Sequence, residues 1–377
     1  MKCRVAALVF HPPHGRTPLE SYVAGGRWAG ISDLITGLRE ADVQEIAIVT
    51  PAASGPVPAG VQIIPSDMGD SFVFGEALKR STAALAAHGV LYFGSGSGAL
   101  LTVDLLERLV AFARGRTPAA LFNNYYSCDF AAFSSAAWLE SLPAVPTDNA
   151  LGFAASETGV PCYAMPRDAA TQFDIDTPTD LVVLSRSDRA GSALRAFIDT
   201  HPLAHPTLDA ALARLADRSA LTAFVGRMSP ATWAAVEREV ACRTSALSES
   251  RGSRAAPSGH VPWTRQILER EGMGPFFRAL ERAADAAWID SRPLLAWTAE
   301  PPPADRFASD AFHTDAVEDP IWREFSERAR EASIPMVLGG HGVVSGDLYL
   351  AAEACWKGRE LPRRLHPEAF SWTKESS

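Results

Sequence analysis

The stretch TQFDIDTPTDLVVL, residues 171 to 184, decides the fold because an apolar run with strand-like alternation passes directly into a helix start. Thr177 is a typical N-cap residue, and Pro178 suits the first helical position. The carboxylate of Asp180, at the third helical position, can reach back to free backbone N–H groups. The stretch therefore predicts a strand–helix junction.

Asp174 and Asp176 in the same stretch have no role in the helix start. In a strand they point to one face at its carboxyl end, where open α/β sheets bind ligands. The alternative is that they are solvent-facing acids that interact with the helix dipole. They are the first candidates for a functional site.

The rest of the first half alternates short apolar strands with helical patterns. Strands are predicted at 4–10, 45–50, 60–66, 89–96 and 118–124, and helices at 26–41, 71–88 and 102–114. This alternation is typical of an α/β fold with a mostly parallel, Rossmann-like sheet covered on both faces.

The second half also alternates strand and helix patterns, but less regularly. We expect a strand, loop and helix over 221–240, a strand over 241–250, two helices across 262–287, a strand at 292–297, a rigid turn at 301–307, a helix at 320–332 and a strand, glycine loop and helix over 334–355. With 377 residues, of which 47% are hydrophobic, the chain is long enough for two α/β domains, predicted at 1–190 and 205–360.

Charge and composition narrow the class of protein. The formal net charge of -9 argues against a nucleic-acid or membrane-surface partner. No apolar run approaches the roughly 20 residues needed to cross a bilayer, and the amino terminus is interpreted as the first strand of a cytoplasmic protein. The five cysteines are scattered and odd in number, which is typical of reduced thiols.

The order of these elements and the motif FDIDTPTDL resemble the molybdenum-cofactor-type nucleotidyltransferases, over roughly residues 1 to 185. Among them the chain looks most similar to the guanylyltransferases that activate phospholactate-like acids in deazaflavin-cofactor synthesis. The resemblance implies a sheet of the nucleotide-diphospho-sugar transferase type, a nucleoside triphosphate, a small anionic acceptor and Mg²⁺ or another divalent ion. It also implies that Asp176 is a metal ligand, with Asp174 as a helper.

The chain departs from that family in two places. Instead of a glycine-rich loop after the first strand it has Gly25, Gly26 and Arg27, which are expected to form an anion nest before a helix, or only a helix-start turn. At the fourth strand the family has an acid, whereas this chain has Gly94, Ser95, Gly96, Ser97 and Gly98. Such residues can hold a phosphate or ribose but hold Mg²⁺ poorly.

The segment LFNNYYSCDFAAF, residues 121 to 133, follows a buried strand where the resemblance implies acceptor recognition. Its amides and acids, Asn123, Asn124, Ser127 and Asp129, offer donors and acceptors to a polar substrate. Tandem amides after a strand also favour turns, which is the structural alternative.

No family is apparent in the second half, but its chemistry favours anions. Arg227, Arg243, Arg251 and the GGHG loop at 339–342, with Gly340, His341 and the following Ser345, are expected to converge on one anion site facing the first domain's cleft. His341 is predicted to serve as a general acid or base, or as an electrophile, since histidine titrates near neutrality. Solvated arginines and an ordinary turn are the alternative.

These observations favour a transferase, namely a nucleotidyltransferase-like enzyme acting on a nucleoside triphosphate and a small phosphorylated or carboxylated acceptor. Two alternatives stay open. A glycosyltransferase would use a nucleotide sugar, but its paired-acid motif is absent near 93–98. A non-catalytic nucleotide-binding protein would explain the missing acid.

Overall fold

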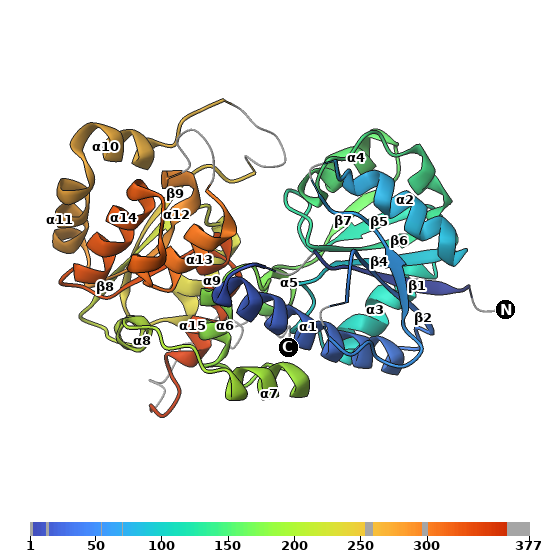
Figure 1. Ribbon diagram of the computed structural model, residues 1–377, viewed down its shortest axis with the longest axis horizontal. Helices are drawn as coiled ribbons and strands as arrows, with labels where there is room; N and C mark the ends of the chain where they lie inside the picture. Colours follow the sequence, from blue (N-terminus) through green and yellow to red (C-terminus); the bar gives the residue numbers. More distant parts are fainter. Residues whose placement is uncertain are drawn as a thin grey trace, which may run out of the picture.

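The computed structural model describes residues 3–12, 15–53, 55–69, 71–252, 259–295 and 301–359. They form two lobes, each built around its own sheet, with the long first helix running from one lobe to the other (Figure 1). None of the helices in these ranges is both long and apolar enough to cross a membrane.

The first sheet has seven strands in the order β3-β2-β1-β4-β6-β5-β7. They are β1 (Val5–Phe10), β2 (Glu45–Thr50), β3 (Gln62–Pro65), β4 (Gly89–Gly94), β5 (Ala119–Phe122), β6 (Phe130–Ser134) and β7 (Cys162–Ala164). Only β6 runs antiparallel to its neighbours. The parallel pairing of β1 with β4 places Phe10 beside Gly94, so their carboxyl ends meet at one edge. The predicted mostly parallel sheet is confirmed.

Helices cover both faces of this sheet, as expected. The helices of the first half are α1 (Pro18–Glu40), α2 (Phe74–Leu85), α3 (Val103–Ala113), α4 (Leu151–Glu157), α5 (Ala169–Gln172), α6 (Pro178–Leu184) and α7 (Ser192–Thr200), with 3-10 turns η1 (Ala136–Ser141) and η2 (Asp148–Ala150). Leu34 of α1 and Leu106 of α3 pack on one face. Leu78 of α2 and Leu151 of α4 pack on the other.

Three local expectations for the first half are wrong. The first helix begins at Pro18 rather than at 26, because Thr17 and Glu20 form a capping box there. Residues 130–134 form β6, where no strand was predicted. Asp174 lies outside any named strand: α5 ends at Gln172, and Asp174 then makes an isolated antiparallel bridge to Ser97.

The second sheet has four parallel strands in the order β11-β10-β8-β9. The strands are β8 (Leu221–Gly226), β9 (Arg243–Ser248), β10 (Ala286–Asp290) and β11 (Met336–Gly339). The helices are α8 (Leu208–Leu215), α9 (Pro230–Glu239), α10 (Trp263–Glu271), α11 (Met273–Ala283), α12 (Ser291–Leu295), α13 (Pro303–Asp310), α14 (Pro320–Glu331) and α15 (Gly346–Ala354), with 3-10 turns η3 (Thr314–Ala316) and η4 (His341–Val344).

Two expectations for the second half are also wrong. The strand predicted at 292–297 lies earlier, as the fully buried β10, and residues 291–295 are helical instead. The rigid turn expected at 301–307 leads into α13, because Pro303 takes the first helical position. The second half does have an α/β arrangement built on a parallel sheet, as the predicted fold class requires.

The two halves share packing. Leu181 of α6 and Ile198 of α7 belong to the same hydrophobic cluster as Phe224 of β8 and Leu348 of α15. In addition, the Thr179 hydroxyl donates to the Leu338 carbonyl of β11 at 2.8 Å. The expected boundary at residue 190 therefore runs through a common core.

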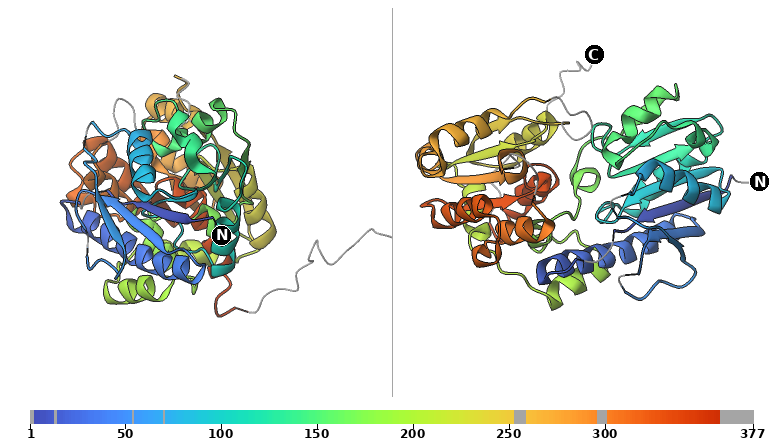
Figure 2. Two further views of the ribbon diagram at one scale, coloured as in Figure 1. Left: turned by 90° about the vertical axis from the view of Figure 1, so that its right-hand side faces the viewer. Right: turned by 45° about the horizontal axis from the view of Figure 1, so that its top comes forward.

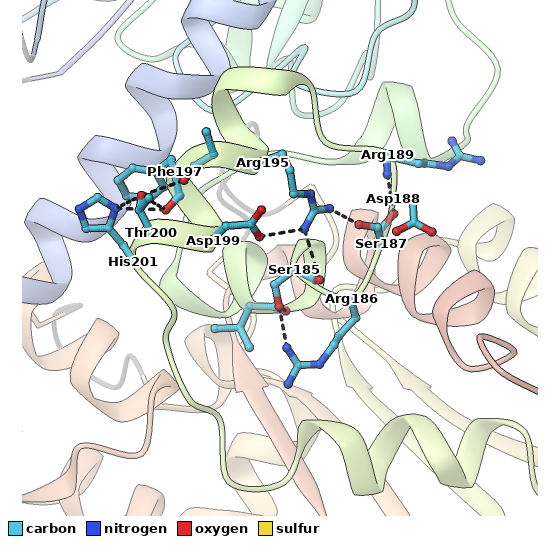
Figure 3. Close-up of polar contacts among 12 residues, drawn as sticks. Ser185, Arg186, Ser187, Asp188, Arg189, Arg195, Phe197, Asp199, Thr200 and His201 are labelled. Carbon is cyan, nitrogen blue, oxygen red and sulfur yellow. Dashed lines mark hydrogen bonds and ion pairs between the residues drawn. The ribbon is translucent and has the colours of Figure 1, made fainter.

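The segment between α6 and α7 is fixed by its own side chains. Arg195 of α7 donates to the backbone carbonyls of Ser185 and Ser187 (Figure 3). Seen from two further directions, α1 and α7 lie side by side along one edge of the junction between the lobes (Figure 2). The junction between the lobes is thus held by packed helices and by hydrogen bonds within the segment that connects α6 to α7.

Candidate active site

Two adjoining cavities open at the carboxyl ends of the strands. The first, of about 290 Å³, has an apolar wall that includes Phe10, Phe74 and Tyr92. The second, of about 370 Å³, lies between the lobes, and its lining includes Arg227 and Arg292. Five residues line both cavities: Arg27, Asp129, Asp148, Asp174 and Asp176. A group of carboxylates and one arginine thus separates an aromatic pocket from a basic one.

Asp176 is placed by the helix start that follows it. The carboxylate of Asp180 accepts hydrogen bonds from the backbone N–H groups of Asp176, at 2.7 Å, and of Thr177. The Asp176 side chain is 56% exposed and pairs with Arg27 at 2.9 Å. The helix cap predicted from the sequence therefore also orients the acid next to it.

Asp174 is half-buried, with its side chain in the two shared cavities. Burial raises its pKa well above the usual range, and the charges of Asp176 and Asp129 raise it further. The close approach of this segment to the β4 end requires Gly96, since a Cβ there would lie 2.4 Å from the Asp174 Oδ1 atom.

Asp129 brings an acid to the β4 end, where the sequence offers only glycine and serine. Its carbonyl accepts from the Gly94 N–H at 2.8 Å and from the Ser97 hydroxyl at 3.0 Å. Burial raises the pKa of its carboxyl to about 8, although a 2.8 Å hydrogen bond from Asn123 opposes that shift. Asp129 immediately precedes β6, the antiparallel strand that the sequence did not predict.

The remaining polar candidates of the first half divide between binding positions and support. Ser95 lines the first cavity, and Asn124 and Ser127 line the second. Ser97 instead donates to the Gly94 carbonyl at 2.8 Å. Asn123 is buried, where it donates to Asp129 and accepts from backbone N–H groups, so it supports the site from behind.

Gly25 and Gly26 do not form an anion nest. Both lie within α1, one and two residues before Arg27. A Cβ on Gly26 would lie 2.6 Å from Leu181, so this glycine permits close packing of α1 on α6. Arg27 alone of the three reaches the cavities, where it also donates to the Ile175 carbonyl.

Arg227 is held rigidly in the second cavity. Its guanidinium contacts the buried Asp290 through two hydrogen bonds, of 2.6 and 3.0 Å. Gly340, His341 and Ser345 line the same cavity. Arg251 reaches Arg227 and His341 through a smaller adjoining cavity.

Arg243 lies elsewhere, which corrects the expected convergence of the three arginines. It is the first residue of β9, and the strand therefore places it at the opposite edge of the parallel sheet. Its guanidinium donates to the Ser219 carbonyl at 2.8 Å.

His341 does not have the near-neutral pKa expected from the sequence. Burial lowers its pKa to about 4, and the charge of Arg227 acts in the same direction. The imidazole is therefore neutral at pH 7, which suits a hydrogen-bond partner and not a charged electrophile.

Asp148, Arg292 and Arg306 also line the cavities, although they were not among the residues predicted from the sequence. Asp148 accepts from the buried Tyr92 hydroxyl at 2.8 Å. Arg292 is paired with the buried Asp310 and lies over the Trp322 ring, with 5.2 Å from its guanidinium carbon to the ring centroid. The position of Arg292, two residues after the buried strand AAWID, was the available signal in the sequence.

The carboxylates of the shared wall could hold a divalent ion only if a bound ligand supplied further oxygen atoms. Among the described residues no group of three or more His, Cys, Asp or Glu side chains is arranged to hold a metal ion by itself. Mg²⁺ usually binds one or two carboxylates and completes its shell with phosphate oxygens and water. Half-buried Asp174 beside exposed Asp176 matches that pattern, because their mutual repulsion decreases when a cation binds.

Comparison with known proteins finds structural matches only. No family model and no curated protein matches the chain. A Desulfovibrio desulfuricans G20 structure provisionally described as a nucleotide-diphospho-sugar transferase shares 15% identity, covering 52% of this chain and 95% of that one, with a TM-score of 0.38. A Methanothermobacter nucleotidyl transferase shares 18% identity, covering 52% and 99%, with a TM-score of 0.35. A Leptospira borgpetersenii cytidylyltransferase shares 15% identity, covering 54% and 95%, with a TM-score of 0.34.

Proposed function

We propose that the protein is a nucleotidyltransferase-like enzyme that joins a nucleoside triphosphate to a small acceptor carrying a phosphate or carboxylate. The observation that carries the proposal is the shared wall of the two cavities, in which Asp129, Asp148, Asp174 and Asp176 lie between an aromatic pocket and a basic one.

The aromatic pocket suits the nucleoside. The rings of Phe10 and Phe74 lie 5.5 and 4.9 Å from the ring of Tyr92, so the wall is closely packed. A planar base gains both apolar burial and ring contacts in such a pocket. The triphosphate would then extend toward Ser95 and Arg27, which line the same cavity.

The basic pocket suits the acceptor. Arg227 and Arg292 are held by buried aspartates, so both guanidinium groups are fixed in orientation before a ligand arrives. Neutral His341 can accept a hydrogen bond from the acceptor. An anion here would lie on the far side of the carboxylates from the nucleotide.

Asp174 and Asp176 would hold Mg²⁺ or another divalent ion between the two ligands. When bound, the ion neutralises charge between the phosphate oxygens and the anionic acceptor. Arg27, paired with Asp176, keeps that carboxylate directed along the shared wall.

Calorimetric titration with ATP, GTP, CTP and UTP, each with and without Mg²⁺, tests the proposal. We expect Mg²⁺-dependent binding of at least one nucleotide, followed by pyrophosphate release when 2-phospholactate is supplied as a first acceptor. Metal-independent binding without turnover would favour a non-catalytic nucleotide-binding protein. Binding restricted to nucleotide sugars would favour a glycosyltransferase, and binding of no nucleotide would refute the proposal.

A further inference from the structure

The second cavity continues outward into a groove that the proposed reaction does not require. A narrow neck shares Arg227 and His341 with the cavity, and shares Tyr126 and Arg251 with the groove. The groove has a volume of about 500 Å³, and its walls come from both halves of the chain. A ligand bound in the cavity can therefore extend into it.

The wall from the first half is aromatic and rigid. Tyr126 is 48% exposed, yet its ring lies 5.2 Å from that of Tyr125 and 5.9 Å from that of Phe153. Its backbone N–H donates to the Asn124 side chain at 3.2 Å. The exposed ring is thus held in place before any ligand binds.

The wall from the second half presents Trp263, which is 64% exposed. The carboxylate of Glu249 accepts hydrogen bonds from the backbone N–H groups of Trp263 and Thr264, at 2.6 and 3.1 Å. Glu249 thereby caps the first turn of α10 and fixes the backbone that carries the indole. Tyr126, Val261 and Trp263 are all exposed and line the same groove, and exposed apolar side chains gathered in one place indicate a binding surface.

Arg251 stands where the neck meets the groove. Its guanidinium carbon lies 5.7 Å from the centroid of the Tyr126 ring. An arginine stacked on an exposed ring offers both a positive charge and a flat surface to a ligand. The path therefore changes from basic in the cavity to aromatic in the groove.

We propose that the acceptor is an elongated molecule with an anionic group at one end and a flat aromatic ring system at the other. The anionic end binds beside Arg227, and the ring binds between Tyr126 and Trp263. The role of this ligand as acceptor rests on the proposed function, whereas its shape and chemistry rest on the groove.

A series of phenylalkyl phosphates with increasing linker length, each compared with the alkyl phosphate of equal length, tests this inference by calorimetry. At the linker length that spans the neck, we expect the phenyl compound to bind about tenfold more tightly, since stacking on aromatic side chains typically gives about 5- to 150-fold in affinity. Trp263→Ala and Tyr126→Ala should remove that preference, and should weaken binding of the phenyl compound more than binding of the alkyl phosphate.

Two exposed aromatic residues outside the groove provide matched controls. Tyr163 is 54% exposed and Trp233 is 41% exposed, and Tyr163→Ala and Trp233→Ala should leave the phenyl preference intact. Urea unfolding of each variant verifies that the fold is retained.

The inference is wrong if the phenyl group adds no affinity at any linker length, or if the control variants lose as much as the groove variants. It is also wrong if the wild-type protein shows no phenyl preference and Trp263→Ala abolishes self-association or the binding of a protein partner. The groove would then be a protein-binding surface. If the wild-type protein binds no nucleotide but shows the phenyl preference, the proposed reaction is refuted and the groove is a site for aromatic anions.

Discussion

At the residue scale, Asp176 combines an exposed carboxylate with a fixed backbone. Its ion pair with Arg27 is accessible to solvent, and such pairs contribute about 0–1 kcal/mol to stability. Asp176→Ala should therefore leave the free energy of unfolding within about 1 kcal/mol of wild type. The same change should weaken Mg²⁺-dependent nucleotide binding by at least about tenfold, because one bound carboxylate is lost.

Calorimetry for nucleotide binding and urea unfolding for stability measure the two effects. Asp104→Ala is the matched control, since Asp104 is an exposed aspartate paired with Arg108 on α3, away from the cavities. Full Mg²⁺-dependent affinity in the Asp176 variant, or its unfolding, would show that this acid does not hold the metal.

Asp347 gives a pH dependence to stability. Burial raises its pKa to about 7, and it lies against the equally buried Asp180. The folded protein holds this proton more tightly than the unfolded chain does. Protonated Asp347 therefore makes its full contribution to the free energy of unfolding below about pH 4, and this contribution is lost as the pH rises toward about 7. Stability should therefore fall over that interval.

Asp347→Asn isolates the effect, because an amide can donate to Asp180 without titrating. We expect urea unfolding at pH 5 and pH 8 to show a smaller loss of stability with rising pH in this variant than in wild type. An equal loss in both proteins would assign the pH dependence to other groups.

At the scale of elements, the sequence predicted the helix starts that depend on neighbouring residues. The hydrogen bonds from the backbone at the start of α6 to the Asp180 carboxylate are present as expected, and so is the helix within 221–240. The strand β6 was missed because its five residues are defined by pairing with β4 and β5, which are distant in the sequence. Asp129 was consequently assigned to the acceptor alone, without its place beside the β4 end.

The start of α1 was misplaced for a different reason. Gly25 and Gly26 resemble a break before a helix, and their actual role is visible only in the contacts with Phe197 and Leu181. Glycine lowers helix propensity, so its presence inside α1 needs the tertiary explanation that the sequence does not provide.

Two glycines of α1 allow a direct comparison of packing with propensity. At Gly26 a Cβ would lie 2.6 Å from the buried side chain of Leu181, whereas at Gly30 the nearest atom would lie at 3.6 Å. Gly26→Ala should therefore destabilise the protein by about 1–3 kcal/mol through overpacking. Gly30→Ala should be neutral or stabilise it by up to about 1 kcal/mol.

Urea unfolding of the two alanine variants measures this difference, and the expected order is Gly30→Ala above wild type or equal to it, with Gly26→Ala below both. The reverse order would mean that α1 and α6 are not packed as closely as the shared core requires.

At the scale of the whole molecule, the two sheets are joined by one hydrophobic cluster that both halves share. The cluster that includes Leu181, Ile198, Phe224 and Leu348 joins segments from both halves. The second cavity of the proposed site takes residues from both halves, and one of them, Phe307, belongs to this cluster. The second half is therefore expected to be part of the catalytic unit.

The shared core leads to a last prediction about cooperativity. Calorimetry should show a single unfolding transition for the full chain, with equal calorimetric and van't Hoff enthalpies, because neither half can keep the cluster buried alone. A fragment of residues 1–190 should not unfold cooperatively, since it would expose α6, whose Leu181 and Val183 are fully buried in the full chain. A fragment of residues 1–204, which restores α7, is the control and should improve little, because β11 and α15 are still missing. Two separate transitions in the full chain, or a cooperatively folded 1–190 fragment, would instead make residue 190 a true boundary between independent domains.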